Sequence, residues 1–336
     1  MPRNASTTKS DPVLPHPDFS RLSAIQDALL AWFGECGRNL PWRHTRDPWA
    51  ILVSEVMLQQ IQVARAIPFY EAFLDRFPTI QSLADAPLAD AIRVWGDLGR
   101  YRRIVHLHRT ARIIVEVHGG LVPDDEAVLR SLPGIGPYTA GAVACFAYGH
   151  DTGFIDTNMR RVLHRVFLGA DVPAPMVRDR ELQTLAIAAV PSGRGWAWNQ
   201  GLMDLGARVC TARKPACDQC PLGPHCTARP TIQGALDAAP RKSAGATPAY
   251  DSTNRYFRGR ILAELRAIPP VPPENGITMP DLGQRVRPGF EPTDLPWLQE
   301  IVSGLAKDGL AAVAEDRPRY DAVDTDRPST LRIKLP

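Results

Sequence analysis

Four cysteines lie within seventeen residues of this 336-residue chain, and their spacing constrains the fold more than any other feature. They follow the pattern Cys210-x6-Cys217-x2-Cys220-x5-Cys226. The residues between them are too polar and proline-rich to belong to a core, and thiolates are the ligands that zinc and iron–sulfur clusters select. Zinc usually takes two paired knuckles separated by a longer segment. Four closely spaced, single-file ligands favour a cubane iron–sulfur cluster.

The region from about residue 19 to residue 226 is a succession of amphipathic helical segments joined by short turns. Strand-like alternation of polar and apolar residues does not occur in this part of the sequence, so it is predicted to be all-α. Apolar residues recur at three-and-four spacing in six segments, at residues 24–33, 49–62, 64–77, 88–98, 102–118 and 127–132.

The composition changes after residue 227. Residues 228–250 are rich in Ala, Pro, Gly and Thr, which is typical of a linker. Three helices followed by a hairpin, which describe a winged helix, are predicted beyond it. These helices are expected at 254–268, near 280–286 and near 296–309, and two short strands at 311–313 and 330–335 around a turn at 316–319. The predicted fold class is an all-α domain followed by a small α+β winged-helix-like domain at residues 251–336, with residues 1–20 as a disordered tail.

Composition and charge exclude several classes of protein. At 44% hydrophobic and 22% charged residues, the chain is globular rather than disordered throughout. No apolar run approaches the ~18–20 residues of a membrane span, and the polar start carries no secretory signal. The protein is therefore expected to be cytoplasmic, without a membrane partner, in a compartment where disulfides are rare. A net charge of +3 permits nucleic-acid binding without demanding it.

A glycine-containing turn forms a second motif, Leu132-Pro133-Gly134-Ile135-Gly136-Pro137-Tyr138. Two glycines let the backbone turn tightly, and the helix predicted over 139–148 begins with unpaired N–H groups that suit a phosphate. A Gly-x-Gly turn between helices is more often a structural corner, so the motif by itself leaves both interpretations open.

Two carboxyl groups are candidates for catalysis. Glu55 stands alone in the apolar segment 51–58, and burial there would raise its pKa, which suits a general acid. Asp156 precedes a basic amphipathic helix predicted over 159–167. The structural alternatives are a helix N-cap for Asp156 and a surface position for Glu55.

Taken together, these segments resemble the adenine DNA glycosylases (the MutY family), of the type with a winged-helix-like C-terminus in place of a Nudix-like domain. The resemblance covers about residues 20–227. The turn and the cysteine spacing are shared with endonuclease III relatives, whereas Glu55 followed by Leu-Gln-Gln, with Tyr138, points to the adenine branch. The motifs that carry it are Leu40-Pro41-Trp42-Arg43, residues 54–63, residues 132–139, Asp156-Thr157-Asn158 and the four cysteines.

The resemblance implies a helix-hairpin-helix glycosylase domain at residues 21–227. A six-helix barrel would occupy about residues 42–141, and a second lobe, built from residues 21–41 and 142–227, would carry a [4Fe–4S] cluster on the four cysteines. Residues 228–250 remain the linker. DNA would lie across the groove between the lobes, with the target base flipped out.

The resemblance also implies roles for individual residues. Glu55 would protonate the departing adenine, and Asp156 would stabilise the cationic sugar, as paired carboxyl groups do in glycoside cleavage. Tyr138 and Asn158 would orient Asp156. The residues expected to contact DNA are Leu58, Gln59, Gln60, Arg100, Tyr101, Gly134 and Gly136.

The activity implied is removal of adenine opposite 8-oxoguanine or guanine in double-stranded DNA, by a monomer. No lysine occurs between Lys9 and Lys214, so no side-chain amine there can form a Schiff base. The enzyme is therefore expected to be monofunctional and to leave an abasic site. Two alternatives are a glycosylase for thymine or uracil opposite guanine, because Thr157 is a small non-glycine residue also seen in such relatives, and a non-catalytic iron–sulfur DNA-binding regulator.

Overall fold

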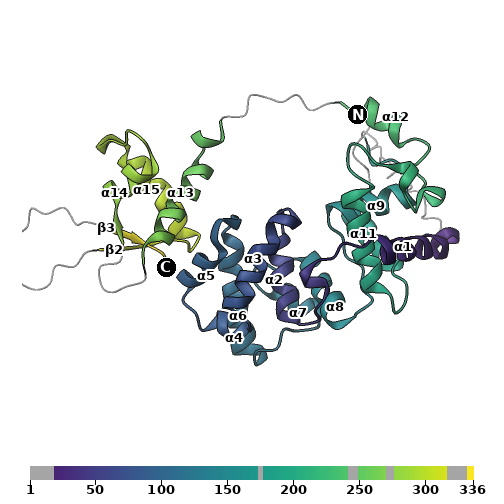
Figure 1. The fold of residues 1–336 in the computed structure, drawn as a ribbon, viewed down its shortest axis with the longest axis horizontal. Helices are drawn as coiled ribbons and strands as arrows, with labels where there is room; N and C mark the ends of the chain where they lie inside the picture. The colour runs from purple at the N-terminus through teal and green to yellow at the C-terminus, as the bar shows by residue number, and fades with distance from the viewer. Residues whose placement is uncertain (1–18, 173–176, 241–248, 270–275, 316–330) are drawn as a thin grey trace, which may run out of the picture. The chain divides into compact units, whose positions relative to one another are not determined.

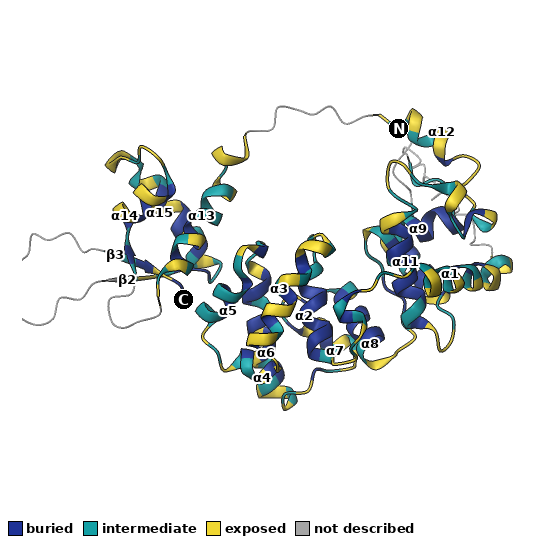
Figure 2. Cartoon of the chain, viewed as in Figure 1, coloured by how far each residue is buried: buried dark blue, intermediate teal, exposed yellow. Residues whose placement is uncertain are grey.

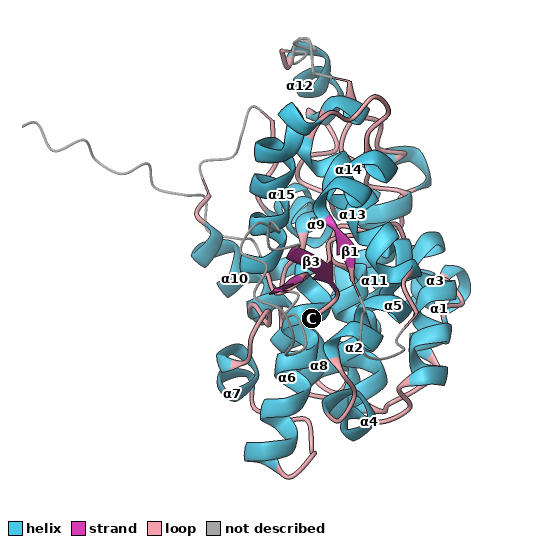
Figure 3. Cartoon of the chain, turned by 90° about the vertical axis from the view of Figure 1, so that its left-hand side faces the viewer, coloured by secondary structure: helices cyan, strands magenta, loops and turns pink. Residues whose placement is uncertain are grey.

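The structure is a computed structural model that describes residues 19–172, 177–240, 249–269, 276–315 and 331–336. Most of the described residues are helical, and three short strands form a small sheet (Figure 3). The predicted fold class, all-α with a small α+β region at the C-terminus, is confirmed. The predicted turn at residues 316–319 and nearly all of the predicted N-terminal tail lie outside the described residues.

The chain divides into two compact units. The first combines residues 1–39 and 144–242, and the second combines residues 40–143 and 243–336. Helix α8 (Pro137–Tyr148) runs across the boundary at residue 143. The first unit otherwise contains α1 (Leu22–Cys36), α9 (Thr157–Phe167), α10 (Asp179–Ala188), α11 (Gly195–Arg208) and α12 (Ile232–Ala238) (Figure 1).

The second unit contains a helical part and the C-terminal region. Its helices before the chain leaves the unit are α2 (Pro48–Leu58), α3 (Val63–Arg76), α4 (Ile80–Ala84), α5 (Leu88–Trp95), α6 (Arg102–His118) and α7 (Glu126–Ser131). The C-terminal region adds α13 (Asn254–Ala267), β1 (Ile277–Thr278), α14 (Met279–Val286), α15 (Leu295–Lys307), β2 (Ala312–Glu315) and β3 (Leu331–Lys334).

Helix α2 is the most deeply buried element of its unit (Figure 2). Asp47 begins it by accepting hydrogen bonds from the backbone N–H groups of Trp49 and Ala50, as an N-cap should. The prediction that this helix continues to residue 62 was wrong, because α2 ends at Leu58. Gln60 adopts a left-handed backbone conformation, with φ of +61°, which no α-helix can accommodate.

Aromatic rings fill the core beside α2. Phe73 lies 5.1 Å from Phe77 and 6.0 Å from Trp95, measured between ring centroids, and all three side chains are fully buried. Tilted and edge-on pairs of this kind are the arrangements that aromatic quadrupoles favour. The helix predicted to reach residue 98 ends at Trp95, because Gly96 has φ of +55° and begins a short 3-10 turn.

The C-terminal sheet has the order β1-β3-β2, and both pairings are antiparallel. Ile333 is fully buried at its centre, opposite Ile277 on one side and Val313 on the other. Strand β1 was not predicted, since two residues are too few to show a period. A further difference concerns α12, which lies within the segment predicted as a linker and buries Ile232, so that part of the segment is folded.

Candidate active site and metal centre

Glu55 lies in the middle of α2 and is 2% exposed. Its neighbours along the helix, from Trp49 to Met57, are all buried. The alternative that Glu55 occupies the surface is therefore wrong. A carboxyl group at this position is shielded from bulk water.

The loop after α2 is held by one buried arginine, Arg103 on α6. Its Nη1 donates to the carbonyl oxygens of Val56, Met57 and Gln59, at 3.0, 2.8 and 2.8 Å. These carbonyls belong to the C-terminal end of α2, where no further helical N–H groups are available to pair with them. The guanidinium thereby fixes the loop that contains Gln59 and Gln60.

The same guanidinium holds a second loop. Arg103 Nη2 donates to the carbonyl oxygen of Gly99 at 3.3 Å, and Nε donates to that of Arg100 at 3.4 Å. Arg100 is exposed and has φ of +53°. Tyr101 is half-buried, and burial is the main cause that raises its pKa. Two loops predicted to contact DNA are thus anchored by the side chain of Arg103. The sequence analysis did not single out Arg103, which is the last of four consecutive residues Arg-Tyr-Arg-Arg.

The glycine turn precedes α8. A Cβ at Gly134 would lie 2.8 Å from the Cβ of His106, and φ of Gly134 is +77°, so this position requires glycine. A Cβ at Gly136 would meet nothing within 4 Å, which leaves the backbone there open to a ligand. Thr139, in the first turn of α8, accepts a 3.3 Å hydrogen bond from Gln59. The half-buried Tyr138 lies beside it, and the turn and the α2 loop therefore meet within the second unit.

Asp156 is the N-cap of α9, which confirms the structural alternative for this residue. Its Oδ1 accepts hydrogen bonds from the backbone N–H groups of Asn158 and Met159 at 2.9 and 2.6 Å. Its Oδ2 accepts from Nδ2 of Asn158 at 3.2 Å. An N-cap role does not exclude catalysis, because these three bonds hold the carboxylate in one orientation.

Arg161 connects Asn158 to the cysteine segment. Its Nη2 donates to Oδ1 of Asn158 at 2.8 Å and to the carbonyl oxygen of Gly206 at 2.6 Å, and its Nε donates to that of Cys210 at 2.6 Å. Gly206 permits this packing, since a Cβ there would lie 2.8 Å from the Cβ of Asn158. A continuous set of hydrogen bonds therefore runs from the first cysteine of the motif to Asp156.

The four motif cysteines line one pocket in the first unit. Within the described ranges, no group of three or more His, Cys, Asp or Glu side chains is arranged to hold one metal ion. The four cysteines share the lining of this one pocket. That arrangement fits a [4Fe–4S] cluster, in which each of four irons takes one thiolate.

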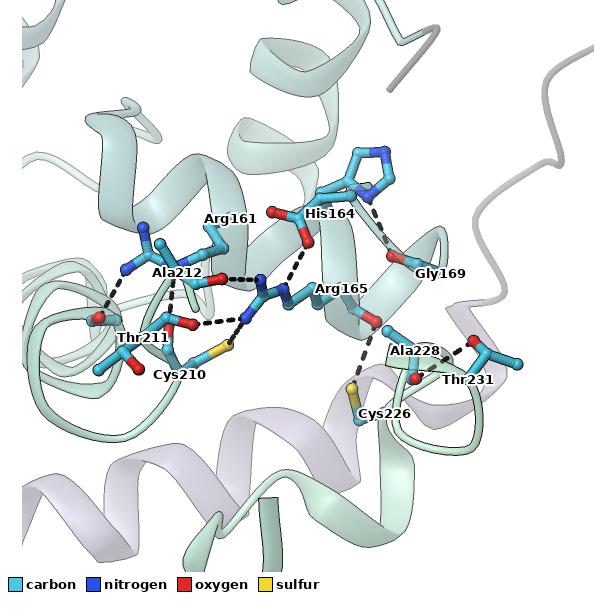
Figure 4. A network of polar contacts seen from close by, with 12 residues as sticks. Arg161, His164, Arg165, Gly169, Cys210, Thr211, Ala212, Cys226, Ala228 and Thr231 are labelled. Carbon is cyan, nitrogen blue, oxygen red and sulfur yellow. Dashed lines mark hydrogen bonds and ion pairs between the residues drawn. The ribbon is translucent and has the colours of Figure 1, made fainter. Parts of the chain in front are cut away.

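The charges around the pocket also fit. Burial raises the pKa of the Cys220 thiol to about 11 and raises those of Cys210 and Cys226, so the thiolate forms need positive charge nearby. Arg165 supplies part of it, with Nη1 at 3.7 Å from Sγ of Cys210 (Figure 4). Cluster irons would supply the rest.

Arg165 also holds the backbone of the cysteine segment. It donates to the carbonyl oxygens of Thr211 and Ala212 at 2.7 and 3.0 Å (Figure 4). It also pairs with Asp171 at 2.6 Å. Burial lowers its pKa, but the bond to Asp171 and the nearby Cys210 reverse the effect, so that the pKa lies above its ordinary value. Sequence reasoning treated helix α9 as generally basic and did not single out Arg161 or Arg165.

The predicted site residues fall into two groups. Glu55, Tyr138 and all of the predicted DNA contacts belong to the second unit, whereas Asp156, Asn158 and the cysteines belong to the first. In the second unit, Arg103 connects the loop of Gln59 to that of Arg100. In the first unit, Arg161 connects Asn158 to Cys210.

Comparison with known proteins assigns the chain to a family. Residues 53–186 match the model of the HhH-GPD superfamily of base excision DNA repair proteins. An adenine DNA glycosylase of Mycobacterium tuberculosis (strain H37Rv) is 43% identical over 262 residues, which cover 76% of this chain and 83% of that protein. The chain belongs to the adenine DNA glycosylase family. The human adenine DNA glycosylase is 41% identical over 64% of this chain, and that stretch covers 41% of the human protein.

The family assignment extends to the metal centre. Residues 210–226 match the iron–sulfur binding domain of endonuclease III, which confirms the predicted [4Fe–4S] cofactor. That the four cysteines of this segment are its ligands stays a prediction. Among solved structures, a thermostable thymine-DNA glycosylase is 29% identical, with a TM-score of 0.59 over 62% of this chain and 97% of that one. A non-covalent endonuclease III–DNA complex, 21% identical with a TM-score of 0.53 over 61% of this chain and 94% of that one, shares the fold. Among the described residues of this family member, no helix has the length and apolar character of a membrane span.

Proposed function

We propose that this protein is a monofunctional DNA glycosylase that removes adenine mispaired with 8-oxoguanine or guanine and leaves an abasic site. It would act as a monomer on double-stranded DNA. The observation that carries the proposal is the buried carboxyl group of Glu55, in a chain that is 43% identical to adenine DNA glycosylases over 76% of its length.

Glu55 is the proposed general acid. Adenine is a poor leaving group, so a ring nitrogen must gain a proton as the glycosidic bond stretches. A carboxyl group buried in an apolar helix is kept from losing its proton to bulk water, which suits it to donate to a base that enters the site.

Asp156 is the proposed partner for the sugar. As the bond breaks, positive charge develops on the deoxyribose, and a fixed carboxylate stabilises that charge electrostatically. The bonds from the start of α9 and from Asn158 hold the carboxylate of Asp156 in one orientation, and Tyr138 is proposed to assist. Water then attacks the sugar carbon, which leaves an abasic site.

The DNA contacts are proposed to extrude the target base. Gln59, Gln60 and Leu58 would occupy the space that the base leaves, while Arg100 and Tyr101 contact the flanking nucleotides. Gly134 and Gly136 would bring backbone N–H groups close to a phosphate. Extrusion costs a few kcal/mol and least at a mispair, which favours mismatched sites.

The bound [4Fe–4S] cluster would supply a fixed structural centre for residues 210–226. Hydrogen bonds of the chain's own residues would then connect this centre to Asp156. Cys210 bonds to Arg161, Arg161 bonds to Asn158, and Asn158 bonds to Asp156.

The proposal is tested by single-turnover base release from four duplexes that contain A:8-oxoguanine, A:G, T:G or U:G pairs. Both adenine duplexes should release adenine. Glu55→Gln and Asp156→Asn should each abolish release and leave DNA binding largely intact, whereas Glu116→Gln, which changes an exposed carboxyl on α6, should have no effect. Unchanged release by either site variant would remove these residues from the mechanism.

A second candidate is a glycosylase for thymine or uracil opposite guanine. The 29% identity to a thymine-DNA glycosylase, over 62% of this chain, favours it. Activity on the T:G or U:G duplex with none on the adenine duplexes would establish this alternative. Release from none of the four would instead favour the non-catalytic regulator.

The monofunctional assignment has its own test. Bifunctional relatives cleave the strand through a lysine at the position of Tyr138, and a lysine Schiff base can be trapped with borohydride. We expect intact strands that break only after alkali treatment, and no covalent adduct with borohydride. Prompt nicking by the purified protein, with a trapped adduct, contradicts the assignment.

A further inference from the structure

A groove of about 1070 Å³ lies in the second unit, and arginine is the most frequent residue in its lining. Its walls come from the loop after α2, the start of α3, the loop before α6 and the first turns of α13. Seven arginines and two aspartates line it. We call it the arginine groove.

Both aspartates of the arginine groove are already neutralised. Asp308 forms ion pairs with Arg102, at 2.6 Å, and with Arg258. Asp97 pairs with Arg266 on α13. Across the part of the chain that the structure describes, the exposed side chains of Arg100 and Arg255 form no ion pair, so the groove presents a net positive charge to its occupant.

Tyrosine rings stand among these arginines. Tyr250 and Tyr256 lie 5.7 Å apart in an edge-to-face pair, and Tyr250 is 61% exposed. Arg260 lies 6.0 Å from the ring of Tyr256. Arginines that contact phosphates, combined with aromatic faces that stack on bases or sugars, are the usual equipment of a nucleic-acid groove.

Backbone strain is concentrated at the same groove. Among the described residues, Gln60 and Arg100 are the two non-glycine residues with positive φ, at +61° and +53°, and both line it. Such conformations cost about 1–3 kcal/mol each and persist where the surroundings fix them, typically at functional sites. Arg103 supplies that fixation, because it bonds to the carbonyl oxygens of Gln59 and Arg100.

We propose that the arginine groove binds the phosphodiester backbone of the DNA substrate, so that the C-terminal region takes part in binding through α13. The occupant is inferred from the uncompensated positive charge and from continuity with the Gln59–Gln60 loop, which the proposed function places at the extruded base. The inference rests on that proposed function for the identity of the substrate. An acidic protein segment is the competing occupant.

The test uses the full chain and a fluorescent duplex, with dissociation constants measured between about 50 and 200 mM salt. Each phosphate contact contributes about 0.9 to the slope of log K against log salt. Arg255→Ala should therefore weaken binding several-fold and lower the slope by about 1, whereas Arg255→Lys should retain the slope. Arg112→Ala is the matched control, since Arg112 is an exposed arginine on α6 outside the groove.

A second measurement locates the contact on the DNA. Methylphosphonates, which are uncharged, replace the phosphates of the duplex one at a time. In the wild-type chain, methylphosphonates at one or two positions should weaken binding. The same replacements should not weaken binding further in Arg255→Ala. Tyr250→Ala should weaken binding without changing the salt slope, because a stacking contact releases no counterion.

The outcomes separate this proposal from the proposed function. If Arg255→Ala keeps the wild-type slope and responds to every methylphosphonate as the wild type does, the groove does not bind DNA, even if adenine is released normally. If the slope falls as expected but no duplex releases its base, the groove assignment stands and the proposed function fails. Intact secondary structure by circular dichroism excludes unfolding as the cause.

Discussion

Two buried arginines, Arg103 in the second unit and Arg165 in the first, do similar structural work in different electrostatic settings. Arg103 is 9% exposed and Arg165 is 2% exposed. Each donates several hydrogen bonds to backbone carbonyl oxygens of a loop that has no regular partner of its own. In both units, the N–H donors of one planar guanidinium bond to carbonyl oxygens that regular secondary structure would otherwise pair.

Arg103 and Arg165 differ in the groups that balance their positive charge. Arg165 pairs with Asp171 and lies beside Cys210, which together hold its pKa above the ordinary value despite burial. Arg103 contacts no carboxylate among the described residues; burial, and then the charge of Arg100, lower its pKa to about 10. It remains protonated at neutral pH, stabilised by the partial negative charge at the C-terminal end of α2.

This difference matches the tasks proposed for the two regions. The Asp171 carboxylate and the Cys210 sulfur lie beside the guanidinium of Arg165, so its positive charge is balanced within the region that holds the cysteine segment. Arg103 instead lines the arginine groove, and its charge adds to the potential there. The compensated Arg165 holds the cysteine segment, whereas the uncompensated Arg103 holds two loops and is proposed to add to the attraction of the groove for phosphate.

The largest effect is expected from Arg165→Met. Removing one member of a buried ion pair costs about 3–5 kcal/mol, because the other member is left without its partner. The carbonyl oxygens of Thr211 and Ala212 also lose their donors. We expect iron content and absorbance near 400 nm to fall sharply, together with the free energy of unfolding from urea denaturation. A variant with full iron and unchanged stability would show that the thiols alone hold the segment.

Arg103→Met should have the next largest effect. It removes the donors for Val56, Met57 and Gln59, and a buried unsatisfied acceptor costs about 1–3 kcal/mol. Because the loops that it holds are proposed to contact DNA, base release should fall while absorbance near 400 nm per chain stays at the wild-type level. Arg103→Lys should recover stability only in part, since an ammonium cannot span both loops. Loss of the cluster in either variant would contradict the separation of the two regions.

Much of the fold could be predicted from periodicity. The helix predicted at 102–118 matches α6 at both ends, because its apolar stripe, followed by Gly119, is strongly marked. The hydrophobic pattern of the sequence does not show where helix α2 ends. The apolar residues continue past Leu58, and the helix ends because a side chain more than forty residues away bonds to its last carbonyls.

The site was predictable to the same degree. Motif chemistry was enough to select Glu55, Asp156 and the cysteines as candidates, because their residue types and spacing carry the signal. It missed Arg103, Arg161 and Arg165, since an arginine in a basic helix looks the same whether it is solvated or buried. Their roles depend on carbonyl oxygens contributed by distant segments, and no local pattern records those contacts.

Arg161→Gln tests the connection between the cysteine segment and Asp156. An amide can keep one bond to Asn158 but cannot also reach the carbonyl oxygens of Gly206 and Cys210. Residues that orient an active group typically contribute about 10- to 100-fold in activity. We expect the single-turnover rate to fall within that range, with a loss of stability near 1 kcal/mol and unchanged DNA affinity. An equal loss in Arg160→Gln, whose ion pair with Asp179 lies at the surface of the same helix, would show a general effect on α9.

The smallest effect is expected at Asp308, where the arginine charge is compensated near the surface. Burial raises the pKa of this carboxyl, but its bonds to Arg102 and the charge of Arg258 more than offset that, so the pKa lies below the ordinary value of 3.8. A depressed carboxyl pKa contributes stability that is present above 3.8 and is lost as pH falls through the folded-state value. Asp308→Asn should therefore lower Tm by roughly a few degrees at pH 7, as exposed pairs do, and the difference from the wild type should shrink below pH 4. A Tm difference that stays constant down to pH 3 would mean that Asp308 acts through packing rather than charge. The ion pairs of Asp308 would then make no contribution to the charge balance of the arginine groove.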